Sequence, residues 1–397
     1  MKRRLLPILM TLVLVCALPI WAAFVTSGDV TNPLVCTAGA TLPDLQAKID
    51  AAADNATITL DSDTTITETL VITGKTLTLD LNGCTLRMTG TGSVLKVSGR
   101  ATLTITDSRP QNPHTGSYAG LPAGGVITGG KADRGGGILL GGGCTLKLTG
   151  GCITDCHAIG AGGGGVVLNG DTAILYMSGT ARIENCTAGE TWGANAIFNS
   201  GTMYADGGTV DGTVNNQGTI RLSEGAAAET VFNGTVYNRS AGTIKAGRYN
   251  ETVENRGTIT GGTFYGGVTD DGGTIEDGAY ETVKFNSDNG AQAKEEKVLR
   301  GQKVPNPAAP TKSGHTFIDW YLGVAPYDFD TPVTAPLTLT AKWEKVPSSG
   351  GYYYYPTTDA KTDDTKSSPK TADPGVALYA ALSLLSLTGL TCATKKR

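Results

Sequence analysis

Three related phrases decide the fold of this chain: Gly124-Gly125-Val126-Ile127-Thr128, Gly150-Gly151-Cys152-Ile153-Thr154 and Gly179-Thr180-Ala181-Arg182-Ile183-Glu184. Between them, Cys144-Thr145-Leu146-Lys147-Leu148-Thr149-Gly150 is answered by Ala173-Ile174-Leu175-Tyr176-Met177-Ser178-Gly179. The phrases return within the period of roughly 20 to 50 residues that marks proteins built from stacked repeats. The middle of the chain is therefore expected to stack one similar unit on the next.

Each repeat contains three short apolar alternations separated by Gly, Asn or Asp, which predicts three short strands and three turns. A helix is disfavoured, because each interior glycine would cost it about 1 kcal/mol. A single coil cannot bury its apolar side, but coils stacked at about 4.8 Å pair their backbones and enclose a continuous core. We therefore predict an all-β chain whose residues 40–282 form a single-stranded, right-handed parallel β-helix. In this respect the sequence resembles the pectin-lyase-like β-helix family, a resemblance that implies a shape and no particular activity.

The repeats become shorter after Met203. Gly-Thr-Ile phrases follow Val-x-Asn phrases, and the sequence predicts smaller coils with tighter turns there. The Val-x-Asn or Val-x-Asp phrases are Val214-Asn215-Asn216, Val236-Tyr237-Asn238, Val253-Glu254-Asn255 and Val268-Thr269-Asp270.

Two departures from the repeat are expected at its start and within it. Residues 42–53 place Leu42, Leu45, Ile49 and Ala53 on one helical face, which predicts an amphipathic helix that caps the open end of the stack. Residues 108–121 break the rhythm with two prolines and predict a loop that protrudes from one coil. Loops of this kind often carry ligand contacts in repeat proteins, which makes His114 and Tyr118 candidate contact residues.

A second module is expected over residues 283–343. It opens with Val283–Gly290, centres on Gly314–Tyr321 and closes with Leu337–Trp343, an order that resembles the Listeria–Bacteroides repeat, the internalin B-repeat family. The resemblance implies a small β-grasp-like module of bacterial surface proteins. Trp320 is either a core residue of this module or a stacking site for a sugar or peptide.

The two ends of the chain have the composition of export and anchoring segments. Residues 1–23 place three basic residues before an apolar run, as in a secretory signal peptide, with an uncleaved membrane anchor as the alternative. Residues 344–375 are rich in Thr, Asp, Lys, Ser and Pro and predict a disordered stalk. Residues 376–394 predict a transmembrane segment, and residues 395–397 a basic tail on its cytoplasmic side.

A short motif precedes that apolar segment: Ser368-Pro369-Lys370-Thr371-Ala372. The arrangement resembles a Gram-positive cell-wall sorting signal, in which a sortase cleaves Leu-Pro-x-Thr-Gly after the Thr. Pro369, Lys370 and Thr371 match this pattern, whereas Ser368 and Ala372 depart from it. The resemblance implies sortase and peptidoglycan as partners. The alternative is a plain C-terminal membrane tail.

Charge and cysteine content narrow the function classes. The formal net charge is −4 without a basic stripe, which argues against a nucleic-acid partner. Cys156 follows Ile153, and Cys186 follows Ile183, by the same spacing, so these cysteines are expected to stack as an inner ladder or to form a disulfide. A zinc site is the weaker alternative, since the chain has no Cys-x2-Cys pair and only His157 is near.

No residue group points to catalysis, a metal or a cofactor. Asp270-Asp271 is the nearest carboxylate pair, yet Asp270 takes a turn position that asparagines hold in the earlier coils. We therefore predict a non-enzymatic, exported protein of the bacterial cell surface, attached at its C-terminus to wall or membrane, that binds an extracellular glycan or protein. Two alternatives are a polysaccharide lyase or hydrolase of the β-helix type, which needs clustered carboxylates, and a passive spacer that presents residues 283–343.

Overall fold

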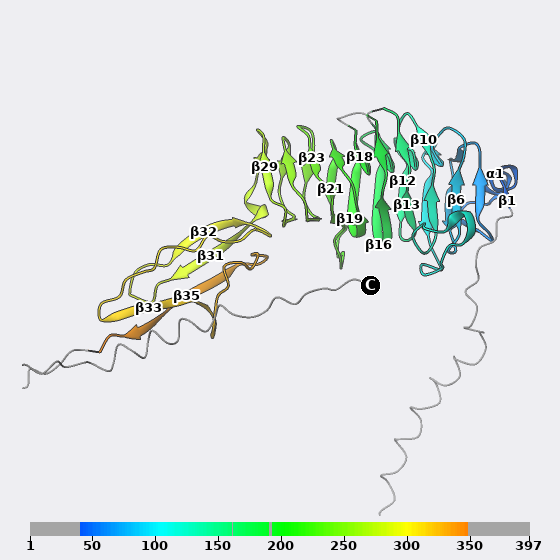
Figure 1. The fold of residues 1–397 in the computed structure, drawn as a ribbon. Helices are drawn as coiled ribbons and strands as arrows, with labels where there is room; N and C mark the ends of the chain where they lie inside the picture. Colours follow the sequence, from blue (N-terminus) through cyan, green and yellow to red (C-terminus); the bar gives the residue numbers. More distant parts are fainter. Residues whose placement is uncertain (1–39, 161, 190–192, 348–397) are drawn as a thin grey trace, which may run out of the picture. The chain divides into compact units, whose positions relative to one another are not determined.

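The computed structural model describes residues 40–160, 162–189 and 193–347. The predicted signal peptide, sorting motif and transmembrane segment, and nearly all of the predicted stalk, lie outside these residues. Within them, residues 40–276 form a stack of coils whose short strands pair in parallel with the coils before and after (Figure 1). This arrangement confirms the predicted all-β stack of parallel repeats.

The first face of the stack is one parallel sheet, and each of its strands ends in a turn to the next face. Among the described residues its strands are β4 (Leu70–Thr73), β7 (Leu95–Ser98), β11 (Ile138–Gly141), β15 (Val166–Asn169), β18 (Ile197–Asn199), β20 (Val214–Asn216), β23 (Val236–Asn238), β26 (Val253–Asn255) and β29 (Val268–Asp270).

A second, larger sheet bends into two further faces, and the long strands β16 (Ile174–Glu184) and β19 (Thr202–Val210) run along both. The second face also contains β2 (Ala56–Thr59), β5 (Thr76–Asp80), β8 (Thr102–Thr106), β12 (Thr145–Leu148), β21 (Thr219–Arg221), β24 (Thr243–Ile244), β27 (Thr258–Ile259) and β30 (Thr274–Ile275). The third face contains β1 (Ala40–Thr41), β3 (Thr64–Ile66), β6 (Thr85–Met88), β9 (Val126–Thr128), β13 (Cys152–Thr154), β22 (Val231–Phe232), β25 (Arg248–Tyr249) and β28 (Thr263–Phe264). A small additional sheet joins β10 (Lys131–Ala132), β14 (His157–Ala158) and β17 (Thr187–Ala188).

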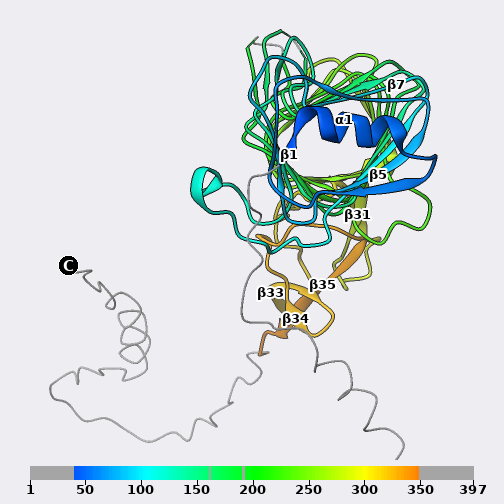
Figure 2. The same ribbon diagram turned by 90° about the vertical axis from the view of Figure 1, so that its right-hand side faces the viewer.

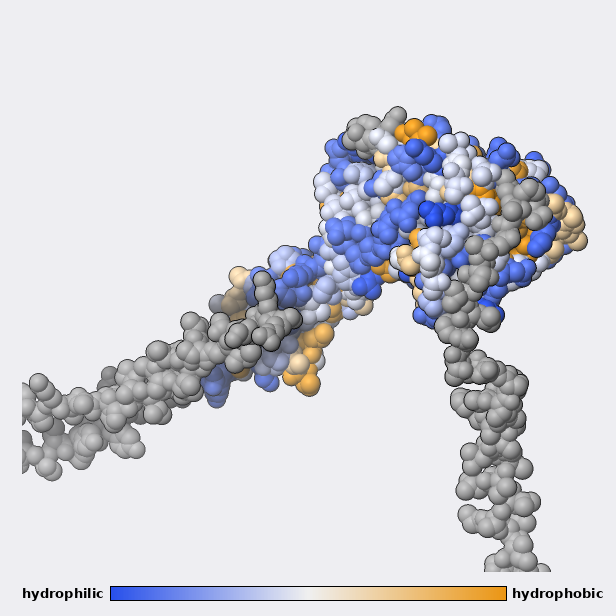
Figure 3. All heavy atoms as spheres, turned by 45° about the vertical axis from the view of Figure 1, so that its right-hand side comes forward, coloured by the Kyte–Doolittle hydropathy of each residue, from blue (hydrophilic) through white to orange (hydrophobic). Residues whose placement is uncertain are grey.

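Like residues lie over like in the core, as expected for stacked repeats. Alternate residues of a strand point inward, and the inner positions carry buried aliphatic side chains such as Leu103, Leu146 and Leu175 in successive coils. The outer surface is mainly polar on the face shown in Figure 3. The apolar interior, closed along the whole stack, supplies the driving force for folding.

The predicted cap helix is present as α1 (Leu42–Ala51), two residues shorter than expected. It lies across the open end of the coils (Figure 2). Leu45 and Ile49 are buried against the first coils, and Lys75 Nζ donates hydrogen bonds to the carbonyls of Ile49 and Ala52 near the helix end, both at 3.0 Å. The helix therefore seals apolar surface that the stack would otherwise expose.

The interior changes character along the stack. One inner position of the first face is aliphatic in the early coils, as Ile72, Val97, Leu140 and Leu168, and then becomes Asn199, Asn216, Asn238, Asn255 and Asp270. On the third face, Phe232, Tyr249 and Phe264 stack with ring centroids 4.9 and 5.1 Å apart. These later coils are the shorter ones that the sequence predicts.

The second module has a five-stranded sheet in the order β32-β31-β35-β33-β34. Its strands are β31 (Tyr280–Asn286), β32 (Lys294–Leu299), β33 (His315–Leu322), β34 (Ala325–Pro326) and β35 (Leu337–Lys345), and a short 3-10 turn, η2 (Asp277–Ala279), precedes them. The sheet begins three residues before the predicted boundary at 283. Because β31 pairs with β35 in parallel and β33 with β35 antiparallel, this is a mixed sheet. Its buried side chains form a core of their own.

Candidate functional site

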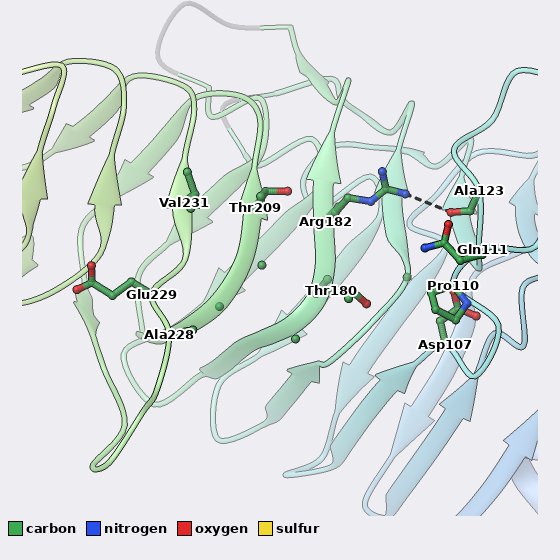
Figure 4. A pocket seen from close by; sticks show the side chains of 15 residues that line it. Asp107, Pro110, Gln111, Ala123, Thr180, Arg182, Thr209, Ala228, Glu229 and Val231 are labelled. Carbon is green, nitrogen blue, oxygen red and sulfur yellow. Dashed lines mark hydrogen bonds between the residues drawn. The ribbon is translucent and has the colours of Figure 1, made fainter. Parts of the chain in front are cut away.

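A groove of about 580 Å³ lies at the bend between the second and third faces. Its floor belongs to β16 and β19, and Arg182, Thr180 and Thr209 project from it (Figure 4). Gly179, Ala181, Gly207 and Gly208 line the floor, and their small side chains leave the space of the groove open. At Gly208, where φ is +77°, an added Cβ would lie 2.4 Å from the carbonyl oxygen of Ala181. The tight bend of the strand therefore requires glycine here.

Two insertions close the groove along the stack. Asp107, Pro110, Gln111 and Ala123, from the start and end of the predicted loop, form one wall, and Ala228–Val231 form the other (Figure 4). The groove thus spans a few coils and is bounded at both ends. Since coils repeat at about 4.8 Å, such a groove fits a short segment of a ligand better than a long polymer parallel to the stack.

Arg182 is the central charged group of the groove. Its Nη2 donates a hydrogen bond to the carbonyl of Ala123 at 3.2 Å, and its Nη1 lies 3.9 Å from Oε2 of Glu184. The Arg182 side chain stays 37 % exposed, whereas that of Glu184 is 17 % exposed. A guanidinium held in place yet open to solvent can bind carboxylate, sulfate, hydroxyl or carbonyl oxygens.

The two carboxylates that line the groove, Asp107 and Glu229, accept hydrogen bonds from backbone N–H groups. Asp107 accepts hydrogen bonds from the backbone N–H groups of Gly83 at 2.7 Å, Gly125 at 2.6 Å and Arg109 at 3.2 Å. It thereby fastens both ends of the inserted loop to the stack. Glu229 accepts a bond from the Gly247 N–H at 3.4 Å.

The loop places His114 and Tyr118 in packing roles. His114 contacts the Gly124 carbonyl through Nε2 at 2.7 Å and the Thr85 hydroxyl through Nδ1 at 3.3 Å. Tyr118 ends a 3-10 turn, η1 (Gly116–Tyr118), and is 7 % exposed, with its hydroxyl 3.1 Å from that of Thr65. Both side chains hold the loop against the coils, so the candidate contact surface moves from them to the groove beside the loop.

Trp320 is a core residue of the second module. It is 2 % exposed and packs edge-on against Phe285 and Phe317, with centroid distances of 5.1 and 5.7 Å. The alternative in which its indole stacks on a ligand is wrong for this structure, because the ring is enclosed.

Cys156 and Cys186 lie one above the other in successive coils, and both are buried free thiols. The stacking that both the ladder and the disulfide require is thus present, with the two thiols reduced in this structure. Cys152 is also buried, and burial, followed by the nearby Glu184 carboxylate, raises the pKa of its thiol far above the usual value. A buried neutral thiol is a poor nucleophile or metal ligand. Among the described residues no group of three or more His, Cys, Asp or Glu side chains could hold a metal ion.

The Asp270-Asp271 pair lies at the end of the stack, away from the groove residues in the sequence and in the coil order. Asp270 accepts a hydrogen bond from Nδ2 of Asn255 at 3.0 Å, which makes it the last rung of the asparagine series. Asp271 is exposed and forms an ion pair with Arg256, whose Nε lies 2.7 Å from its Oδ2. The structure therefore gives both carboxylates local structural contacts.

Sequence reasoning missed the groove and the role of Arg182. Arg182 takes the strand position that Cys152 and Val126 hold in the two coils before it. Thr209, Val231 and Arg248 follow at the same position in later coils, so the repeat pattern alone did not distinguish Arg182. The second wall, at 228–231, has no sequence signal either, because only the bend of the coils brings it near the first.

Comparisons with known proteins identify one part of the chain. Residues 282–342 match the family model of the Listeria-Bacteroides repeat domain. The second module is a Listeria-Bacteroides repeat domain, as its sequence indicates. From here on it is called the repeat domain.

Two proteins of Evansella cellulosilytica are similar to this chain over 67 residues, each at 39 % identity. They carry the provisional names membrane protein and Gly-rich membrane protein. The similarity covers 16 % of this chain and only 10 % and 8 % of the two relatives.

No solved structure matches this chain. Among the described residues, no helix is long and apolar enough to span a membrane. The predicted transmembrane segment at 376–394 lies outside them.

Proposed function

We propose that this protein is a non-enzymatic adhesion protein of a Gram-positive cell surface, and that it binds a short segment of an extracellular glycan or protein in the groove around Arg182. The observation that carries the proposal is the groove itself. It combines a rigid β floor, two end walls and one partly exposed guanidinium. Rigid floors with a few placed polar groups are typical of binding sites.

The surface setting of the proposal rests on the repeat domain and on the two ends of the chain. The relatives' names favour a membrane or surface location. In this proposal the stack is a pectin-lyase-like, right-handed β-helix, and the repeat domain is β-grasp-like. Residues 1–23 direct export, residues 344–375 act as the stalk, and cleavage after Thr371 by a sortase joins the protein to peptidoglycan.

Catalysis finds less support in the groove. Glycoside hydrolysis requires two carboxyl groups placed on either side of the scissile bond. Asp107 is engaged by three backbone N–H groups, and Glu229 lies at the opposite wall. The two groups therefore shape the groove ends, and binding without cleavage is the function that this geometry favours.

The test is binding of the full chain to a printed array of host and bacterial glycans and, in parallel, to immobilised extracellular-matrix proteins. Arg182→Ala should weaken binding to the best probe roughly 10- to 100-fold, because it removes a charge-assisted hydrogen bond of about 1.5–3 kcal/mol. Arg221→Ala is the matched control, since Arg221 is exposed on the second face and packs over the Tyr204 ring outside the groove.

Unchanged binding by Arg182→Ala, or an equal loss with Arg221→Ala, would overturn the groove as the site. Release of shortened oligosaccharides from a bound glycan, abolished in an Asp107→Asn or Asp271→Ala variant, would favour the enzyme alternative. A variant that carries substitutions only within residues 283–343 tests the spacer alternative. If the stack were a passive spacer, this variant would lose ligand binding.

A further inference from the structure

Cys156 and Cys186 occupy the same place in two successive coils, with the same local backbone. Each follows a residue with positive φ, Asp155 at 51° and Asn185 at 52°. The strands on either side are in register, since Ile153 pairs with Ile183, and His157 with Thr187. The Thr187 N–H donates to the Cys156 carbonyl at 2.9 Å.

This register places the two Cα atoms one strand spacing apart. Neighbouring strands lie about 4.7–4.9 Å apart, and disulfides join residues whose Cα atoms are about 4.4–6.8 Å apart. Both side chains point inward, because Cys156 is 1 % and Cys186 5 % exposed. Two stacked, inward-facing cysteines thus meet the Cα-distance requirement for a disulfide bond.

The sulfur atoms have each other as neighbours in a confined space. A hydrogen bond between the two thiols is the main cause that raises the pKa of Cys156, followed by burial. In the preceding coil the equivalent position is Gly130, which brings no side chain to the pair. A Cβ added at Gly165 would lie 3.4 Å from the Cys186 Sγ, so this glycine leaves the space beside that sulfur open. Neither glycine brings a further thiol to the pair.

A separate cysteine shows that the fold accommodates oxidised cysteine. Cys84 is disulfide-bonded, and disulfides form and persist in oxidising compartments. The remaining described thiols are less suited to pair with Cys186. Cys152 lies in register with Arg182 in the next coil, and Cys144 belongs to the turn that begins the second face.

We propose that Cys156 and Cys186 form an oxidative cross-link site that joins successive coils just after the strands of the third face. Both thiols lose their protons, one sulfur–sulfur bond forms, and the two electrons reduce a low-molecular-weight disulfide to two thiols. The bond forms during folding, while the thiols are accessible, because both sulfurs are enclosed once the coils have closed. This site is independent of the ligand in the groove.

The test compares two oxidation protocols for the full chain, with oxidised glutathione as the oxidant. In the first, reduced unfolded protein refolds in its presence; in the second, folded reduced protein is exposed to it. Free thiols are then alkylated under denaturing conditions, and non-reduced tryptic peptides are analysed by mass. Trypsin separates the two cysteines, since Cys156 lies in the peptide 148–182 and Cys186 in the peptide 183–221.

We expect the two peptides to be linked in most molecules after oxidative refolding and in few after exposure of the folded protein. Because peptide 148–182 also contains Cys152, variants assign the bond: Cys152→Ala should keep the link and Cys156→Ala should abolish it. Cys144→Ala is a further control that should keep it. Recovery of both peptides as alkylated or glutathionylated thiols after refolding, or a link that survives Cys156→Ala, would overturn the proposal.

Discussion

The early and late coils of the stack use the same fold with different interiors. The early coils are longer than the late coils. The register partners Thr73 and Ser98 are 25 residues apart, and His157 and Thr187 are 30 apart. In the late coils the rungs of the asparagine series are separated by 17, 22, 17 and 15 residues.

The turn after the first face explains the change. In the early coils this turn is closed by backbone hydrogen bonds, and a small buried residue fills the space inside it. The residues that close it in this way are Ala101, Cys144 and Ala173, whose N–H groups donate to Ser98, Gly141 and Gly170. An aliphatic residue can then precede the turn, since the turn satisfies its own polar groups.

In the late coils an asparagine side chain closes the tight turns after Asn199 and Asn255, whereas the longer turn after Asn238 keeps a backbone hydrogen bond from the Gly242 N–H to the Arg239 carbonyl at 2.7 Å. Asn199 Oδ1 accepts from the Gly201 N–H at 3.0 Å, and its Nδ2 donates to Asn216 Oδ1 at 2.8 Å. Asn216, Asn238 and Asn255 continue the series to Asp270. Each amide also lies near a carbonyl of the following coil, such as that of Thr219 at 3.3 Å. Short coils thus replace a buried apolar contact with a buried hydrogen-bonded chain.

The comparison teaches that the two kinds of interior are not interchangeable. An amide is stable in the core only where every neighbour supplies a partner, and each net hydrogen bond contributes about 1 kcal/mol. An aliphatic side chain is stable at this position only where the backbone groups of the following turn are already hydrogen-bonded. Exchanging the two residue types in each half tests this directly.

The largest effect is expected from Leu140→Asn in the early half. Leu140 is fully buried between Val97 and Leu168, so the amide would lose apolar burial and find no partner. We expect the free energy of unfolding to fall by about 4 kcal/mol in a urea titration. Leu139→Asn, at the half-buried neighbouring position, should lose less than about 1 kcal/mol. Similar losses for both variants would contradict the account of an apolar ladder.

A somewhat smaller loss is expected from Asn238→Leu in the late half. The change removes the acceptor of Asn216 Nδ2 and the donor to Asn255 Oδ1. We expect a loss of about 3 kcal/mol in the same titration, because buried polar groups are left unpaired. Asn250→Leu is the matched control, since its amide bonds to Asn233 at the surface. The ladder would have no special role if Asn238→Leu were as mild as this control.

The smallest effect is expected from Asp270→Asn at the end of the series. An amide oxygen there still accepts from Asn255 Nδ2 and from the Gly273 N–H, and its NH2 group faces solvent. The free energy of unfolding should change by less than about 0.5 kcal/mol. A loss of more than about 2 kcal/mol, measured in parallel with Asn238→Leu, would show that the terminal charge is essential.

Several features could be predicted from particular residues. The related phrases at 124–128 and 150–154 predicted stacked strands, which β9 and β13 confirm, and Leu45 and Ile49 marked the cap helix. The equal spacing of Cys156 and Cys186 after their isoleucines predicted their stacking, and the order of aromatic residues identified the repeat domain. These features depend on local spacing, which a sequence shows directly. The asparagine positions were recognised as equivalent turns, but their hydrogen-bonded chain was not foreseen.

The sequence by itself determined the stacked-repeat plan, since periodic apolar residues and glycines permit few other structures. Tertiary structure alone decided the groove around Arg182, the enclosure of His114, Tyr118 and Trp320, and the direction of the asparagine chain. These depend on which side chains meet across coils and loops far apart in sequence. The physical reason is that burial and hydrogen-bond partnership are properties of the packed chain, whereas periodicity is a property of neighbouring residues.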